Sequence, residues 1–171
     1  RERQIASALV VTGPSGSGRT SFLDVLRRTV FDGTEVAQLT LSERPASEAA
    51  FVTQLAEALD LDVASEPSLS VLERLLLAEA GAPRRRVCFI ENMEHLLLRA
   101  PGGSSLVERV AVFLSRTDRV VFWVTTMVSP AWHFLERTEP QVTALAQTLL
   151  AQGRSAVHPL DPPARWPGSR S

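Results

Sequence analysis

The sequence predicts an α/β fold of three layers, a mainly parallel sheet with helices on both faces. The largely apolar run at 5–11 and the continuous apolar runs at 87–90 and 120–124 are typical of strands that are buried on both sides. Between them lie segments in which apolar residues recur at helical spacing. The chain has 171 residues, 44% of them hydrophobic and 22% charged, which suits one domain with a substantial core.

The first half of the chain is expected to alternate strands with helices. Ser47 can cap a helix through its hydroxyl, and Gly81 is a suitable residue just beyond the end of another. Asp32 and Gly33 form a turn between the first helix and the second strand. The expected elements are a strand at 5–11, a helix at 19–30 with Phe22, Leu23, Val25, Leu26 and Val30 on its apolar face, a strand at 35–41, a helix from 47 to about 59 and a helix from 68 or 70 to 81.

The second half continues this alternation. Ser129 and Pro130 form a good helix start, because a capping hydroxyl precedes a proline at the first helical position. Residues 1–153 are predicted to form a single domain, and the proline-rich stretch 154–171 to be mainly loop or disordered. The expected elements are a strand at 87–90, a helix from about 93 that is broken at 101–103, a helix at 105–115, a strand at 120–124 followed by Thr125 and Thr126, a helix from 129 and a helix at 139–152.

Composition argues against some classes of partner. The formal net charge of −1 does not favour attraction of the whole domain to nucleic acid or an anionic membrane, although a local basic patch at 84–86 stays compatible with it. No stretch approaches the roughly 20 apolar residues of a membrane span, and no signal peptide is visible, so a cytoplasmic location is expected. The single cysteine, Cys88, lies in an apolar run and is expected to be a buried core thiol.

Residues 13–20, Gly-Pro-Ser-Gly-Ser-Gly-Arg-Thr, fit the pattern GxxxxG[KR][ST] of a phosphate-binding loop. Glycine lets the backbone turn with positive φ and approach a phosphate closely, and successive N–H groups then form a nest for an anion. The helix that follows adds the positive end of its dipole. The hydroxyl of Thr20 lies where a magnesium ion that bridges the terminal phosphates needs a ligand. We therefore predict binding of a nucleoside triphosphate, with ATP preferred.

Arg19 occupies the position where lysine is usual in such loops, and all eighteen basic residues of the chain are arginine. Lysine is a compact point charge, whereas a guanidinium is planar and fork-shaped. Arginine should still favour phosphate binding, but it suits the charge that develops during phosphate cleavage less well. Binding is therefore expected, and fast hydrolysis is not.

The strand at 87–90 ends in a second candidate site residue. Glu91 lies at the carboxyl edge, where parallel sheets bind ligands, and it is predicted to hold magnesium through water. In many enzymes of this kind the next residue is a glutamate that activates water, but here it is Asn92, and an amide cannot take a proton. Glu94 is a candidate substitute, although a solvated carboxylate at a helix start is the simpler interpretation.

The order of these features resembles that of AAA+ ATPases and their STAND relatives, which share the P-loop NTPase fold. The run Phe89-Ile90-Glu91-Asn92-Met93-Glu94-His95-Leu96-Leu97 is similar to the STAND segment LDNxEHLL, with glutamate in place of aspartate. The resemblance covers about residues 5–150. By position it implies that the cofactor, ATP with Mg²⁺, is held by the loop residues Gly13, Pro14, Ser15, Gly16, Ser17, Gly18, Arg19, Thr20 and Ser21.

The resemblance also implies roles for residues outside the loop. Thr20 and Glu91 would hold the metal, and Thr125 or Thr126 would take the polar sensor position near the γ-phosphate. The candidate catalytic residues are therefore Glu91, Asn92, Thr125 and Thr126. The family further uses an arginine from a neighbouring subunit or a lid domain, for which Arg137 and Arg154 are weak candidates.

These features favour a nucleotide-binding switch that binds ATP·Mg²⁺ with slow or no turnover, within a larger regulator whose other domains or subunits are its partners. The alternative is an active oligomeric AAA+ ATPase that acts on DNA or on a protein partner. A P-loop kinase is disfavoured because no arginine-rich lid segment follows Glu91. A GTPase is disfavoured because guanine recognition commonly uses an Asn-Lys-x-Asp run and the chain has no lysine.

Overall fold

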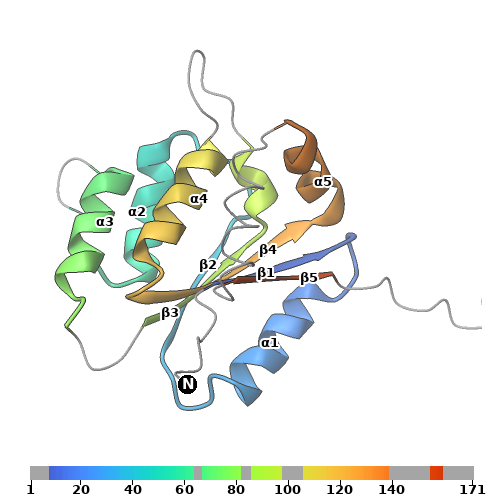
Figure 1. Cartoon of the computed structure of the whole chain (residues 1–171), viewed down its shortest axis with the longest axis horizontal. Coiled ribbons are helices and arrows are strands. Elements are labelled where there is room, and N and C mark those ends of the chain that lie inside the picture. Colours follow the sequence, from blue (N-terminus) through green and yellow to red (C-terminus); the bar gives the residue numbers. More distant parts are fainter. Residues whose placement is uncertain (1–7, 64–66, 82–85, 98–105, 139–154, 160–171) are drawn as a thin grey trace, which may run out of the picture.

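The computed structural model describes residues 8–63, 67–81, 86–97, 106–138 and 155–159. The described strands form one parallel sheet in the order β2-β3-β4-β1-β5, shown in Figure 1. These strands are β1 (Ala8–Gly13), β2 (Val36–Thr40), β3 (Arg86–Glu91), β4 (Val121–Val128) and β5 (Ser155–Pro159). The predicted α/β fold with a parallel sheet is confirmed. Because β1 lies inside the sheet, the loop that follows it opens beside the carboxyl end of β4.

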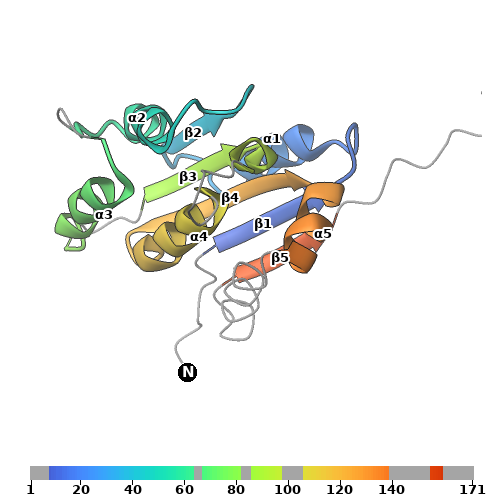
Figure 2. The same ribbon diagram turned by 90° about the horizontal axis from the view of Figure 1, so that it is seen from above.

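Helices cover both faces of this sheet (Figures 1 and 2). One face carries α1, whose Leu23 packs with Val87 and Phe89 of β3. The alternate residues of the same strand, Cys88 and Ile90, pack with the helices of the other face. The helices are α1 (Arg19–Thr29), α2 (Glu48–Ala58), α3 (Leu69–Ala78), α4 (Leu106–Thr117) and α5 (Ser129–Thr138), with a 3₁₀ turn, η1 (Met93–Leu96). Burial raises the pKa of the Cys88 thiol to about 12, as befits a core residue.

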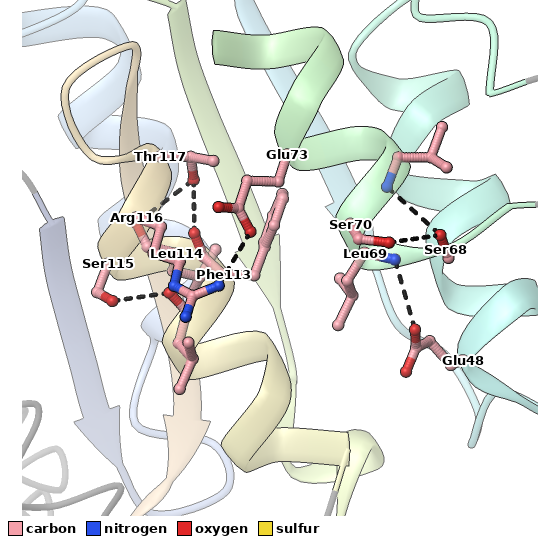
Figure 3. Close-up of polar contacts among 12 residues, drawn as sticks. Glu48, Ser68, Leu69, Ser70, Glu73, Phe113, Leu114, Ser115, Arg116 and Thr117 are labelled. Carbon is pink, nitrogen blue, oxygen red and sulfur yellow. Dashed lines mark hydrogen bonds and ion pairs between the residues drawn. The ribbon is translucent and has the colours of Figure 1, made fainter.

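Polar contacts join the three helices that pack over β2, β3 and β4 (Figure 3). The Glu48 carboxylate of α2 accepts a hydrogen bond from the Leu69 N–H at the start of α3, 3.4 Å away, and pairs with Arg109 of α4. Arg116 of α4 lies 3.6 Å from the Glu73 carboxylate of α3. These contacts fix the helices relative to one another, while the buried apolar side chains beneath them supply most of the stability.

Side-chain caps begin two of the helices as the sequence predicts. The Ala50 N–H donates to the Ser47 hydroxyl, 3.1 Å away, and the Val71 N–H donates to the Ser68 hydroxyl at 3.4 Å. Ser68, not Ser70, is therefore the cap of α3. That helix ends at Ala78, three residues before Gly81.

Three expectations about secondary structure need correction. The helix expected from residue 93 is the short 3₁₀ turn η1, which begins after Asn92 in left-handed backbone. The strand expected at 120–124 runs to Val128, so that Thr125 and Thr126 lie inside it. Residues 155–159, expected to be loop, form β5 and pair with β1 in parallel.

One correction concerns the surface of α1. Val25 and Val30, expected on its apolar face, are 58% and 62% exposed, because α1 has only a narrow stripe in contact with the sheet. The helix expected at 139–152 and the break at 101–103 lie outside the described residues. Within the part of the chain that the structure describes, no helix combines the length and the apolar character that a bilayer crossing requires.

Candidate functional site

The loop between β1 and α1 is tightly curled, not extended. Gly16 and Gly18 have φ of 76° and 83°, a backbone conformation that residues with a side chain rarely adopt. The Ser17 N–H donates to the Pro14 carbonyl, 3.1 Å away, which closes a turn within the loop. A Cβ placed on Gly16 or Gly18 would meet no other atom within 4 Å, so open space lies beside both residues. The backbone can therefore be approached closely by a ligand.

The start of α1 leaves hydrogen-bond donors free for such a ligand. Gly18 caps the helix without any side-chain hydrogen bond, and the first N–H groups of a helix have no acceptor within it. These groups belong to Arg19, Thr20 and Ser21, and the helix dipole adds partial positive charge there. The hydroxyl oxygen of Ser17 is buried and has no hydrogen-bond partner within the described residues. A buried hydroxyl without a hydrogen-bond partner is uncommon. Together with the free N–H groups, the Ser17 hydroxyl fits an anion such as a phosphate.

Glu91 lies at the bottom of the site and is only 3% exposed. One of its carboxylate oxygens accepts a hydrogen bond from the Thr20 hydroxyl, 3.1 Å away, which links β3 to the start of α1. The other accepts from the Gln38 amide at 2.8 Å and from the Thr40 hydroxyl at 3.2 Å. Gln38 and Thr40 are not among the site residues predicted from the sequence. They stand two residues apart on β2, which pairs with β3, so both lie on one face of the sheet.

Thr20 and Glu91 are suitable ligands for a magnesium ion, which prefers oxygen and usually keeps water and phosphate oxygens in its shell. Nowhere in the described ranges do three or more His, Cys, Asp or Glu side chains gather as a metal site would require. A metal ion at Thr20 and Glu91 would thus depend on phosphate oxygens as further ligands. The residues fit a metal–nucleotide complex better than a metal alone.

Asn92 is placed away from the loop. Its side-chain amide donates to the Leu41 carbonyl, 3.2 Å away, and its backbone N–H donates to the Thr126 hydroxyl at 3.0 Å. Its φ of 62° is left-handed, a conformation that asparagine tolerates better than most residues. Asn92 therefore ties the end of β3 to the segment after β2 and to β4, and its position next to Glu91 in sequence does not bring its amide to the loop.

We expect Asn92→Glu to leave ATP hydrolysis unchanged, because the side chain at this position faces the Leu41 carbonyl. The substitution should lower the free energy of unfolding by about 1–2 kcal/mol, since it removes one hydrogen bond and places a less tolerant residue at positive φ. Phosphate release and chemical denaturation measure the two effects. Asn92→Gly, which keeps the backbone conformation at little cost, is the control and should destabilise less. A tenfold gain in turnover for Asn92→Glu would contradict this placement.

The two threonines of β4 separate onto opposite faces of the sheet. Thr126 contacts the Asn92 N–H and so lies on the side of Glu91. Thr125 alternates with Trp123 and Met127, which pack in the core beneath α2 to α5. Both threonines are buried. The carboxyl end of β4, level with Gly13, is Val128, so the expected strand-end position of the threonine pair is wrong by two residues.

Glu94 is the carboxylate that the structure brings beside the loop. One of its oxygens lies 3.8 Å from the Arg19 guanidinium, and the other accepts a hydrogen bond from the Val128 N–H at 3.2 Å. The side chain is 19% exposed, so the interpretation of Glu94 as a solvated helix-start carboxylate is wrong. The 3₁₀ turn after Asn92 accounts for this placement, because it brings residue 94 back over the sheet edge.

The side chain of Arg19 folds back across the loop. Its guanidinium donates to the Gly13 carbonyl and thereby joins the first loop residue to the start of α1. It is only 13% exposed and also faces Glu94. The guanidinium of Arg19 therefore lies beside the loop, where it contacts Gly13 and Glu94.

Basic residues elsewhere do not form a comparable site among the described residues. Arg86 makes two hydrogen bonds to Glu79 and one to the Leu59 carbonyl; its pKa is raised chiefly by the bond to Glu79. Arg86 also lines a surface cavity of about 840 Å³ at the amino ends of β2 and β3, whereas the loop follows the carboxyl end of β1. Arg137 lies at the exposed end of α5, and residues 84, 85 and 154 lie outside the described ranges.

Comparison with known proteins agrees with the geometry of the loop and the sheet. The model of one family, described as AAA domain, matches residues 2–127. No curated protein is significantly similar to the chain.

Three solved structures show a similar fold, and their TM-scores lie between 0.58 and 0.60. The Aeropyrum pernix ORC2 protein in ADPNP–ADP complexes is 13% identical (TM-score 0.58), with 91% of this chain and 42% of that chain covered. Cdc6p from Pyrobaculum aerophilum is 14% identical (TM-score 0.60; 90% and 38% covered). Drosophila ORC bound to AT-rich DNA and Cdc6 is 12% identical (TM-score 0.58; 92% and 50% covered). The chain thus spans half or less of the length of these relatives, and the likeness is one of fold.

Proposed function

The chain belongs to the AAA domain family, and on this basis we propose that it binds ATP with Mg²⁺ and acts as a nucleotide-dependent switch with slow or no hydrolysis. The observation that carries the proposal is the curled loop at 13–18, which ends at an uncapped helix start and holds the orphan hydroxyl of Ser17. In the proposal residues 1–153, together with β5, form the nucleotide-binding domain. Other domains or subunits of a larger regulator respond to whether this domain has nucleotide bound.

In this function the N–H groups of the loop and of the first turn of α1 bind the phosphate tail of ATP. Arg19 contributes positive charge, and Thr20 and Glu91, which are joined by a hydrogen bond, would hold the magnesium ion. A bound magnesium ion would neutralise charge on the terminal phosphates. Thr126, which is on the same side of the sheet as Glu91, would support this edge through its contact with Asn92.

Two features support slow turnover in this proposal: no base is directed at the loop from position 92, and an arginine occupies position 19. The side chain of Asn92 is bound to the Leu41 carbonyl and cannot act as a base in any case. A guanidinium at position 19 fits developing charge on a γ-phosphate less well than an ammonium. The Asn-x-Glu-His run at 92–95 supports our proposal that the domain is of the STAND type.

A titration with a fluorescent ATP analogue, with and without Mg²⁺, tests the proposal. We expect saturable binding that magnesium strengthens and that unlabelled ATP reverses. Phosphate release, measured on the same samples, should be far below the roughly 1 s⁻¹ that marks the slow end of ordinary enzymes. Lack of saturable binding up to millimolar concentrations would overturn the proposal.

One observation favours a second candidate, an active oligomeric ATPase that acts on DNA or a protein partner. Glu94 places a carboxylate beside the loop, where the expected catalytic residue is missing. Such an enzyme also needs an arginine from a neighbouring copy. Phosphate release per protein that rises steeply with protein concentration, or on addition of DNA, would support this candidate over the switch.

We expect Arg19→Lys to raise turnover roughly threefold to tenfold, a gain of about 1 kcal/mol, without abolishing ATP binding. An ammonium is a more compact charge for the terminal phosphates than a guanidinium. Arg28→Lys on the exposed side of α1 is the matched control and should have no effect. Phosphate release at saturating ATP provides the measurement. Unchanged turnover in Arg19→Lys would mean that the slow step does not depend on position 19.

A further inference from the structure

Glu94 contacts two different elements of the site. One carboxylate oxygen is paired with Arg19 at the start of α1, and the other accepts from the Val128 N–H at the end of β4. Val128 is level with Gly13 across the β1–β4 ladder. Glu94 therefore links the loop to the strand end next to it, and it does so through Arg19, the cationic side chain of the loop.

Arg19 contacts two groups of the described chain. Its guanidinium donates to the Gly13 carbonyl and faces Glu94, with only 13% of the side chain exposed. A guanidinium has five N–H donors, but a phosphate that binds its fork with two parallel hydrogen bonds and a carboxylate that faces the same nitrogen compete for one cation. Of the two, the 3.8 Å contact with Glu94 is the longer and the easier to break.

We propose that Glu94 is a positioning residue that holds Arg19 beside the loop, and that the phosphate tail of a nucleotide competes with Glu94 for this arginine. The inference rests on the proposed function and adds a regulatory feature to that site. When the phosphate takes Arg19, the Glu94 carboxylate loses its cation and keeps its bond to the Val128 N–H, at the residue that precedes α5. Binding of a nucleotide to the loop thereby changes the hydrogen bonding of the Val128 N–H, at the junction of β4 and α5.

Glu94→Gln removes the negative charge but keeps an oxygen that can accept from the Val128 N–H. We expect this variant to bind ATP about fivefold more tightly than the wild type, the size typical of a weak, partly exposed ion pair. Glu57→Gln, an exposed carboxylate on α2, is the control for a general change in charge and should have no effect. Thermal unfolding of each variant verifies that the fold is intact.

Loss of simple repulsion between Glu94 and the phosphates would also tighten binding, and a double-mutant cycle with Arg19→Met separates the two explanations. If Glu94 acts through Arg19, Glu94→Gln should change affinity by less than about twofold in the Arg19→Met background. Repulsion alone would give the same gain, or a larger one, in both backgrounds, and that result would overturn the inference.

The amide signal of Val128 in NMR spectra is a second readout. It should shift on addition of ATP to the wild type, because Glu94 loses its cation, and the shift should be much smaller in Glu94→Gln and in Arg19→Met. Equal shifts in all three proteins would contradict the competition. Failure of the wild type itself to bind ATP would mean that the proposed function fails and the inference with it, whereas binding without coupling would overturn the inference alone.

Discussion

Gly18→Ala lowers the affinity for ATP at least about tenfold. Gly18 has a φ of 83° and is the residue from which the first free N–H groups of α1 extend. A methyl group there projects into the open space beside the loop, where a phosphate has to lie, and it disturbs charge-assisted hydrogen bonds that are worth about 1.5–3 kcal/mol each. Since 1.4 kcal/mol corresponds to a factor of ten, loss of a single such bond gives the expected effect.

Gly33→Ala is the matched control for this variant. Gly33 has a φ of 69° and, like Gly18, would place a Cβ in open space, but it lies in the turn before β2. Both substitutions carry the same backbone strain, about 1–2 kcal/mol, so their effects on thermal unfolding should be similar. Only Gly18→Ala should weaken binding of the fluorescent ATP analogue. A similar loss of affinity in both variants would show that strain, not contact with phosphate, is responsible.

Glu91→Ala should have the largest effect on stability and on the magnesium dependence of binding. Its buried carboxylate accepts hydrogen bonds from Thr20, Gln38 and Thr40, and removal leaves these three donors without their acceptor. We expect the free energy of unfolding to fall by about 3 kcal/mol, at the upper end for loss of a buried polar partner. Magnesium should no longer strengthen ATP binding, because the acid that holds it is missing.

Glu91→Gln separates these two consequences. The amide has nearly the same shape, its oxygen can still accept, and the hydroxyls of Thr20 and Thr40 can turn to accept from its NH₂ group. This variant should keep most of its stability in urea denaturation and should still lose the effect of magnesium on affinity. Magnesium-dependent binding that persists in Glu91→Gln would exclude Glu91 as the residue that holds the metal.

Much of the fold and part of the site are predictable because they depend on local sequence. The phosphate loop is set by glycines that are needed at positive φ, and Glu91 by a short apolar strand that ends in an acid. The caps at Ser47 and Ser68 are likewise encoded within a few residues. The physical cause of each of these features lies in residues that are close together in the sequence.

The remaining features depend on relations between distant segments. The length of β4 is set by its pairing with β1 as far as Gly13, which the apolar run alone does not reveal, and so Thr125 and Thr126 were expected two residues too far along. Glu94 reaches the loop only because Asn92 adopts a left-handed backbone and a 3₁₀ turn follows. β5 has no long apolar run and is a strand because the free edge of β1 pairs with it.

Two-dimensional NMR of the backbone amides tests the central claim, that the main chain between Gly13 and Ser21 binds the phosphates of a nucleotide. The account predicts that ATP·Mg²⁺ shifts the amide signals of Gly16, Gly18, Arg19, Thr20 and Ser21 in a saturable manner, and that adenosine, which has no phosphate, leaves them in place. Signals of these five residues that stay unchanged at millimolar ATP, while the protein remains folded, would contradict it.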